Sequence, residues 1–152
     1  MSPLIGVGAA WAWSGDGDAA VATESLFSTN PIVEQYEISF SRCSSGPRYT
    51  CVVDGDTFWL EGEKIRIADI NTPEVGSPEC AREAQLGAQA TGRLIALLNS
   101  GGFSLETIDR DEDQYGRKLR IVTRDGKSLG DILVEEGLAE EWKGRRSSWC
   151  HP

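Results

Sequence analysis

Three short runs of β-type residues, separated by two turn sequences, lie between residues 49 and 70 and constrain the fold of this chain more than any other feature. The runs cover 49–53, 57–60 and 64–70. The intervening sequences, Asp54-Gly55-Asp56 and Glu61-Gly62-Glu63, are typical of tight turns because glycine and aspartate tolerate the backbone angles that such turns need. The segment is therefore predicted to form a three-stranded meander.

A long helix is predicted to follow the meander. Ser77-Pro78-Glu79 is a typical helix start, with serine as the N-cap and proline at the first helical position. The helix is expected to run to about Leu98 and to end at the sequence Asn-Ser-Gly-Gly that follows. Its predicted buried stripe repeats at helical spacing and consists of Leu86, Ala90, Leu94 and Leu97.

Two strands and a short second helix complete the prediction. The strands are expected at 103–109 and 118–123, on either side of a polar loop. Ser128 and Asp131 form a capping-box-like pair that begins the helix, and Gly137 suits its C-cap. This order predicts an α+β domain, a five-stranded antiparallel OB-type β-barrel with two, or at most three, helices.

The length of 152 residues suits one domain. Residues 1–37 lack hydrophobic periodicity and are interpreted as a tail or a processed signal segment, which leaves 38–152 as the domain. The apolar stretch LIGVGAAWAW near the N-terminus resembles a signal-peptide core but has no Lys or Arg before it. Secretion or periplasmic export is therefore one expectation, and a cytoplasmic protein with an N-terminal extension is the other. No apolar run reaches membrane-spanning length, so no membrane span is predicted.

The four cysteines lack CxxC spacing, which argues against a structural zinc site. Three pairings are possible, and four reduced thiols are the alternative. Cys43–Cys51 with Cys80–Cys150 is the preferred pairing. The first bond would tie the lead-in segment to the first strand, and the second would anchor the C-terminus.

The net charge of −9 is unusual for a protein that binds nucleic acid, because such proteins usually neutralise phosphates with Lys and Arg. Residues 1–42 hold five acidic residues and one basic residue, so part of the imbalance lies outside the predicted domain. A metal site also requires acidic residues. Any nucleic-acid binding is expected to be weak and sensitive to salt.

Asp54 and Asp56 flank Gly55 and can point to the same side of an extended segment. Two close carboxylates repel each other unless a cation or a proton lies between them. An Asp-Gly hairpin turn is the simpler interpretation, and the short motif alone does not decide between them.

The sequence that follows resembles the staphylococcal nuclease family, whose DGDT motif leads through a hairpin into an arginine-bearing strand that ends in Asp-Thr-Pro-Glu. Here the corresponding residues run from Arg66 to Glu74 and read RIADINTPE, and a later DQYGR supplies Arg117. The resemblance covers about residues 50–139. It implies a calcium-dependent phosphodiesterase that hydrolyses DNA and RNA, with single strands preferred, and that leaves 3′-phosphate products. A monomer is expected.

The resemblance also implies a role for each matching residue. Asp56, Asn71 and Thr72, the last through its backbone carbonyl, correspond to calcium ligands, and Asp54 lies near the metal's water shell. Glu74 corresponds to the general base, and Arg66 and Arg117 bind phosphate. Tyr115 packs near the bound nucleotide. The chemistry agrees, since calcium prefers oxygen ligands and arginine donates paired hydrogen bonds to phosphate.

Asn71 departs from the family, which usually has aspartate there, and its neutral amide would lower metal affinity or change the ion preference. Asp69 would share its face in a regular strand and would then restore the charge. Arg66 and Asn71 are an odd number of residues apart, so a shared site requires a bulge or bend between Ile67 and Ile70.

The C-terminal segment, 140–152, replaces the family's third helix. Its tryptophans, Trp142 and Trp149, are expected to cap the core. The alternative is contact with nucleic acid, in which the aromatic rings stack on bases and Arg145 and Arg146 meet phosphates. The acidic charge and Asn71 also leave a second function open. The domain would then be a weak or inactive nuclease-like module that binds single strands or a protein partner.

Overall fold

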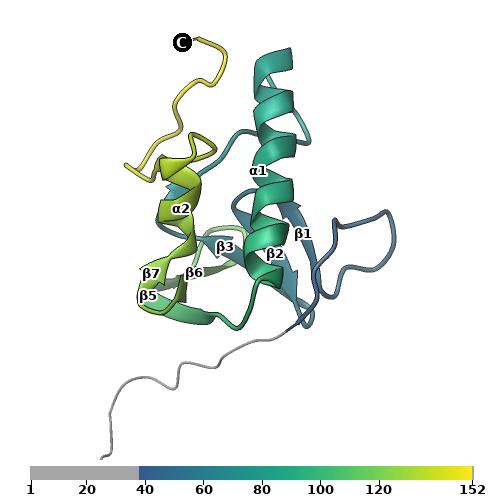
Figure 1. The fold of residues 1–152 in the computed structure, drawn as a ribbon, viewed down its shortest axis with the longest axis vertical. Coiled ribbons are helices and arrows are strands. Elements are labelled where there is room, and N and C mark those ends of the chain that lie inside the picture. The colour runs from purple at the N-terminus through teal and green to yellow at the C-terminus, as the bar shows by residue number, and fades with distance from the viewer. Residues whose placement is uncertain (1–37, 152) are drawn as a thin grey trace, which may run out of the picture.

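A computed structural model of the chain describes residues 38–151. The elements follow the predicted order of strands, helix, strands and helix (Figure 1). They are β1 (Cys51–Asp54), β2 (Thr57–Leu60), β3 (Glu63–Ile67), β4 (Ile70–Asn71), α1 (Ala81–Asn99), β5 (Ser104–Glu112), β6 (Lys118–Arg124), β7 (Lys127–Ser128), α2 (Leu129–Glu135) and β8 (Glu140–Glu141). Within the described residues, no helix is both long and apolar enough to cross a bilayer. The predicted tail at 1–37 lies outside the described residues.

The predicted meander is confirmed, because β1 pairs antiparallel with β2 and β2 with β3. The predicted all-antiparallel, five-stranded barrel is wrong in its pairing. The main sheet has six strands in the order β1-β2-β3-β6-β5, with β7 on β6, and β3 runs parallel to β6. The pairings among the described residues do not close it through β1 and β5. The connection from β3 to β6 runs through β4, α1 and β5 and brings β6 beside β3 in the same direction, which the local sequence pattern could not indicate.

The bend that the Arg66–Asn71 spacing requires is present. Ala68 and Asp69 form a turn between β3 and β4, and β4 leaves the main sheet to pair antiparallel with β8. The N–H of Trp142, just after β8, donates to the carbonyl of Asp69 at 2.9 Å. The C-terminal segment therefore begins beside the arginine-bearing strand.

Helix α1 begins at Ala81, not at Ser77 as predicted. Its N-cap is Cys80, whose sulfur accepts the N–H of Glu83. The Glu83 carboxylate in turn accepts the N–H of Glu79, at 2.8 Å. These contacts hold the residues before Cys80 outside the helix, so the favourable Ser-Pro-Glu start is not used. The buried face includes Ala90, Leu94 and Leu97 as predicted, but Leu86 is only half-buried.

The core lies between the sheet and the two helices (Figure 1). Phe58 of β2 packs edge-on against Phe40 and Phe103, with ring centroids 5.7 and 6.4 Å away. Each buried aromatic or aliphatic side chain of this size contributes about 1.5–3 kcal/mol to folding. Ser128 caps α2 as predicted, and Gly137 adopts a positive φ of 73° after its end.

Both preferred disulfide bonds, Cys43–Cys51 and Cys80–Cys150, are present. The second joins the N-cap of α1 to the C-terminal segment across 70 residues of sequence, and Figure 1 shows that segment beside the N-terminal end of α1. The prediction that the tryptophans cap the core is wrong for Trp142, which is 43% exposed. Trp149 is half-buried.

Replacing Cys80 and Cys150 together with Ala should lower the free energy of unfolding by about 2–4 kcal/mol, because the bond restricts a long loop of the unfolded chain. Urea denaturation of the oxidised double variant and of wild type measures the difference. An unchanged midpoint would show that the bond does not constrain the unfolded chain.

Candidate active site

The hairpin between β1 and β2 presents Asp56 as a buried carboxylate. Its Oδ2 accepts the N–H of Thr72 at 3.0 Å and lies 3.3 Å from a guanidinium nitrogen of Arg66. Its Oδ1 accepts the Thr57 hydroxyl at 3.0 Å. Gly55 makes this approach possible, since a Cβ there would lie 2.7 Å from that of Ala90 and collide with it. The predicted hairpin turn is confirmed, and it carries both carboxylates of the motif.

Asp54 accepts the N–H of Asp56 at 3.2 Å and is the second carboxylate of the pair. Burial first, and then the charge of Asp56, raise the pKa of Asp54 to about 7. A cation beside the pair would favour the ionised form of both groups. The raised pKa of Asp54 is therefore consistent with a site that binds a cation.

Arg66 of β3 is buried and held on three sides. Its guanidinium pairs with Asp56, and Nη1 donates to the carbonyls of Ile67 and of Ile70, the latter at 2.8 Å. The bend after Ile67 turns both carbonyls toward the side chain. Burial lowers the pKa of Arg66 while Asp56 opposes that shift, and the group stays charged at working pH.

Asn71 and Thr72 each carry a buried side-chain oxygen that lacks a hydrogen-bond partner among the described residues. The Asn71 amide nitrogen donates to Glu140 at 3.0 Å, which leaves its Oδ1 unpaired. Unpaired buried oxygens are costly unless something binds them. Oxygen atoms are the ligands that a hard cation such as calcium prefers, and the neighbouring Asp56 carboxylate accepts the N–H of Thr72.

Among the described residues, the Asp69 carboxylate makes no hydrogen bond to Asp56, Asn71 or Thr72. Its carboxylate accepts the hydroxyl of Ser128 at 2.6 Å, at the N-terminus of α2. Burial raises the pKa of Asp69, and the Ser128 hydrogen bond opposes that shift. Asp69 and Asn71 would share a face only in a regular strand, and the turn at Ala68 and Asp69 interrupts the strand there. The structure therefore does not support the hypothesis that Asp69 supplies the negative charge that Asn71 lacks.

Glu74 lies on a loop that α1 positions closely. Its N–H donates to the buried carboxylate of Glu83 at 3.2 Å. Gly87 lies one turn further along α1, where a Cβ would come within 2.8 Å of the Glu74 carbonyl oxygen. Neither Glu83 nor Gly87 is among the residues predicted for the site. An acid in the first turn of a helix was a visible signal for Glu83, but nothing in the sequence linked it to the Glu74 loop.

Arg117 and Tyr115 lie together in the loop before β6. Asp113 accepts the Nε–H of Arg117 at 2.6 Å and its backbone N–H at 3.0 Å, and the guanidinium lies over the Tyr115 ring at 5.3 Å. Partial burial raises the pKa of Asp113, but hydrogen bonds from Arg117 and Tyr115 outweigh it and the pKa lies below its usual value. The loop thus fixes one edge of the guanidinium.

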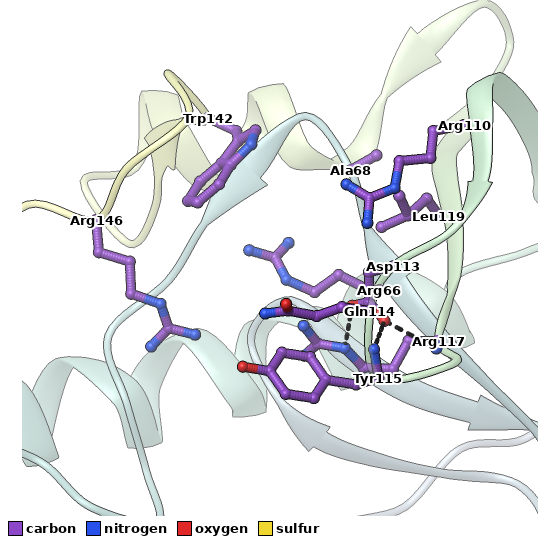
Figure 2. A pocket seen from close by; sticks show the side chains of 10 residues that line it. All are labelled: Arg66, Ala68, Arg110, Asp113, Gln114, Tyr115, Arg117, Leu119, Trp142 and Arg146. Carbon is purple, nitrogen blue, oxygen red and sulfur yellow. Dashed lines mark hydrogen bonds and ion pairs between the residues drawn. The ribbon is translucent and has the colours of Figure 1, made fainter.

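A cavity of about 520 Å³ lies between these groups, and Figure 2 shows four arginines around it. Arg66 and Arg117 were predicted, and Arg146 belongs to the C-terminal segment whose alternative role is contact with nucleic acid. Arg110 of β5 was not predicted. Trp142 forms another wall, with the Arg66 guanidinium 5.7 Å from its ring centroid. Four guanidinium groups give this acidic protein a local positive site. Their convergence depends on the fold, because the four residues lie in separate parts of the sequence.

Glu74 and Asn71 line a neighbouring cavity of about 510 Å³. Arg146 lines both cavities, and its guanidinium forms an ion pair with the Glu74 carboxylate. The structure therefore brings the predicted residues together as two groups. One has the arginines and Tyr115 around the first cavity, and the other has Asn71, Thr72 and Glu74 along the second. Asp56 joins the groups through Arg66 and Thr72.

Much of the part of the chain that carries these residues matches known proteins. Residues 64–149 match the family model described as staphylococcal nuclease homologue. The chain is 39% identical over 92 residues to Endonuclease YncB of Bacillus subtilis (strain 168), which covers 57% of the chain and 43% of the relative. The same identity and length hold for the SPbeta prophage-derived endonuclease YokF of that organism, with 57% of the chain and 31% of the relative covered.

A third match is the Succinoglycan biosynthesis protein ExoI of Rhizobium meliloti (strain 1021), 32% identical over 93 residues, with 58% of the chain and 48% of the relative covered. The chain thus spans less than half the length of each of these relatives. The range matched by the family model includes Arg66, Glu74, Arg117 and Arg146 and begins after the Asp54–Asp56 hairpin.

Proposed function

The chain belongs to the staphylococcal nuclease homologue family, and from this we propose that it is a calcium-dependent nuclease that hydrolyses DNA and RNA, preferably as single strands. The observation that carries the proposal is the convergence of Arg66 and Arg117 on one cavity, with Glu74 lining the neighbouring cavity. A phosphodiester needs cationic donors for its oxygens and a base for the attacking water, and these residues supply both.

In the proposed reaction, Glu74 takes a proton from a water molecule as the water oxygen attacks phosphorus. The bond from phosphorus to the 5′ oxygen breaks, and that oxygen takes a proton from solvent and leaves as a hydroxyl, while the phosphate stays on the 3′ side. Arg66 and Arg117 donate hydrogen bonds to the phosphoryl oxygens and stabilise the charge that develops there. Asp56 and Asp113 orient the two guanidinium groups, and Tyr115 offers a ring surface to the nucleotide.

Asp56, Asn71 and the backbone carbonyl of Thr72 would hold calcium, with Asp54 near its water shell. When bound, calcium would polarise a nonbridging phosphate oxygen and neutralise part of its charge. The neutral amide of Asn71 supports an affinity below that of a site with a second carboxylate.

The two disulfide bonds support a further proposal, that the protein works in an oxidising compartment, secreted or periplasmic.

A weak or inactive nuclease-like module that binds nucleic acid or a protein is the second candidate. Two observations favour it, namely the amide of Asn71 and the pairing of Glu74 with Arg146. The arginine cavity would serve that function as well, so cleavage has to be measured directly.

Cleavage of single-stranded DNA and RNA in calcium tests the proposed function. Activity in calcium should fall by roughly 100-fold or more when a chelator is added, because the charge of the cation no longer assists the reaction. Gel analysis of end-labelled strands measures the rate, and resistance of the 3′ ends to a polymerase until they are dephosphorylated identifies the products. Full activity in chelator would refute calcium dependence. No cleavage with any divalent ion would favour the binding module.

A further inference from the structure

Arg146 occupies a position between the residues proposed to bind phosphate and the proposed base. Its guanidinium pairs with the carboxylate of Glu74 and also lines the arginine cavity with Arg66 and Arg117. Figure 2 shows it reaching toward this cavity from the C-terminal segment, on the side opposite Arg110 and Arg117. Half of the Arg146 side chain is exposed to solvent. It can therefore turn between the two sides of the site without repacking the core.

The backbone around Arg146 is anchored on both sides. Before it, β8 pairs with β4, and Glu140 accepts both the Asn71 amide and the N–H of Ser147. After it, Cys150 is bonded to Cys80 at the start of α1. The segment between the anchors holds Arg146 beside the site while its long side chain stays half exposed. This arrangement limits how far the Arg146 guanidinium can move, but it leaves both Glu74 and the arginine cavity within reach.

Glu74 cannot readily accept a proton from water while a guanidinium holds its carboxylate. A phosphate in the arginine cavity offers Arg146 a second anionic partner with matching geometry, because a guanidinium pairs with phosphate through two parallel hydrogen bonds. We propose that Arg146 is a substrate-binding residue that leaves Glu74 for a backbone phosphate when a strand binds. The proposal rests on the nuclease function proposed above. It couples substrate binding to release of the base.

The experiment measures binding in the Glu74→Gln background, where the competing carboxylate is absent. A fluorescein-labelled single-stranded oligothymidylate is titrated by anisotropy in EDTA, over a series of salt concentrations. Adding Arg146→Ala should weaken binding by roughly 3- to 10-fold, as expected for loss of a charged hydrogen bond at a half-exposed site. The slope of log K against log salt should fall by about 0.7, the value for one lost phosphate contact on a single strand.

Arg145→Ala in the same background is the matched control. It removes the same charge one residue away, but Arg145 lines a different cavity, beside Val134 and Lys143. The control should keep the salt slope, whereas Arg146→Lys should recover most of it, since lysine retains the charge.

Equal binding by the Ala variants at positions 145 and 146 would overturn the role of Arg146 and leave the nuclease proposal intact. If Arg146 served only to hold Glu74, its removal would have no effect once Glu74 is Gln. No binding by any variant, wild type included, would instead overturn the nucleic-acid substrate itself and this inference with it.

Discussion

Replacing Glu74 with Gln should lower kcat for cleavage of single-stranded DNA by about 10²–10⁴-fold, because an amide of the same shape cannot take a proton from water. The backbone of the loop should not move. Its contacts with Glu83 and Gly87 come from the N–H and carbonyl of residue 74, and neither involves the side chain. Single-turnover rates in saturating calcium measure the effect on the chemical step.

Glu79→Gln is the control for this change. Glu79 lies on the same loop and lines the same cavity, so its substitution removes an equal charge without removing the proposed base. Its effect on kcat should stay within a few-fold. A loss of less than 10-fold in Glu74→Gln, or an equal loss in Glu79→Gln, would show that Glu74 contributes charge and not proton transfer. Oligonucleotide binding by Glu74→Gln should persist, since the substitution leaves the arginine cavity unchanged.

Much of the fold follows from local sequence. The turns at Gly55 and Gly62, the cap at Ser128 and the positive φ at Gly137 all depend on interactions within a few residues, and the structure confirms them. The bend after Ile67 was also predictable, because two residues at odd spacing cannot share a face of a regular strand. The odd spacing of Arg66 and Asn71 thus predicts a bend in the chain from the sequence alone.

The remaining features depend on contacts between distant parts of the chain. The parallel pairing of β3 with β6 depends on the connection through α1 and β5. The start of α1 is set by Glu83, which holds the N–H groups before it. Arg146 reached the site because β8 pairs with β4 and Cys150 with Cys80. None of these partners is recognisable from periodicity or propensity.

The disulfide pairing lies between these two classes of feature, because its prediction rests on which segments of the chain need an anchor. That choice is correct for both bonds. The role assigned to the tryptophans is not, because the same anchor leaves Trp142 over Arg66 at the cavity and not in the core.

Arg117→Lys should lower kcat by about 10²–10³-fold, the cost of removing one aligned donor to a developing oxyanion. In the structure Asp113 binds the Nε side of the guanidinium, and the Tyr115 ring covers one face. The Nε edge of the guanidinium is therefore held by Asp113, and the Nη groups remain available to bind phosphate. Lysine keeps the positive charge, but it cannot bind Asp113 and phosphate at once through a rigid planar group. The loss should appear mainly in kcat, because charge still attracts the strand.

Arg120→Lys provides the matched control for this loss. Arg120 lies three residues later, in β6, and pairs with Asp111 at 2.8 Å, and neither residue of this pair lines the cavity. Stability should be similar in the two variants, because each keeps its charge and neither side chain belongs to the hydrophobic core. Comparable activity of the two variants would refute a specific role for the Arg117 guanidinium. A large loss in Arg117→Lys alone, with oligonucleotide affinity changed by only a few-fold, would place that guanidinium in contact with the transition state and not merely with the bound strand.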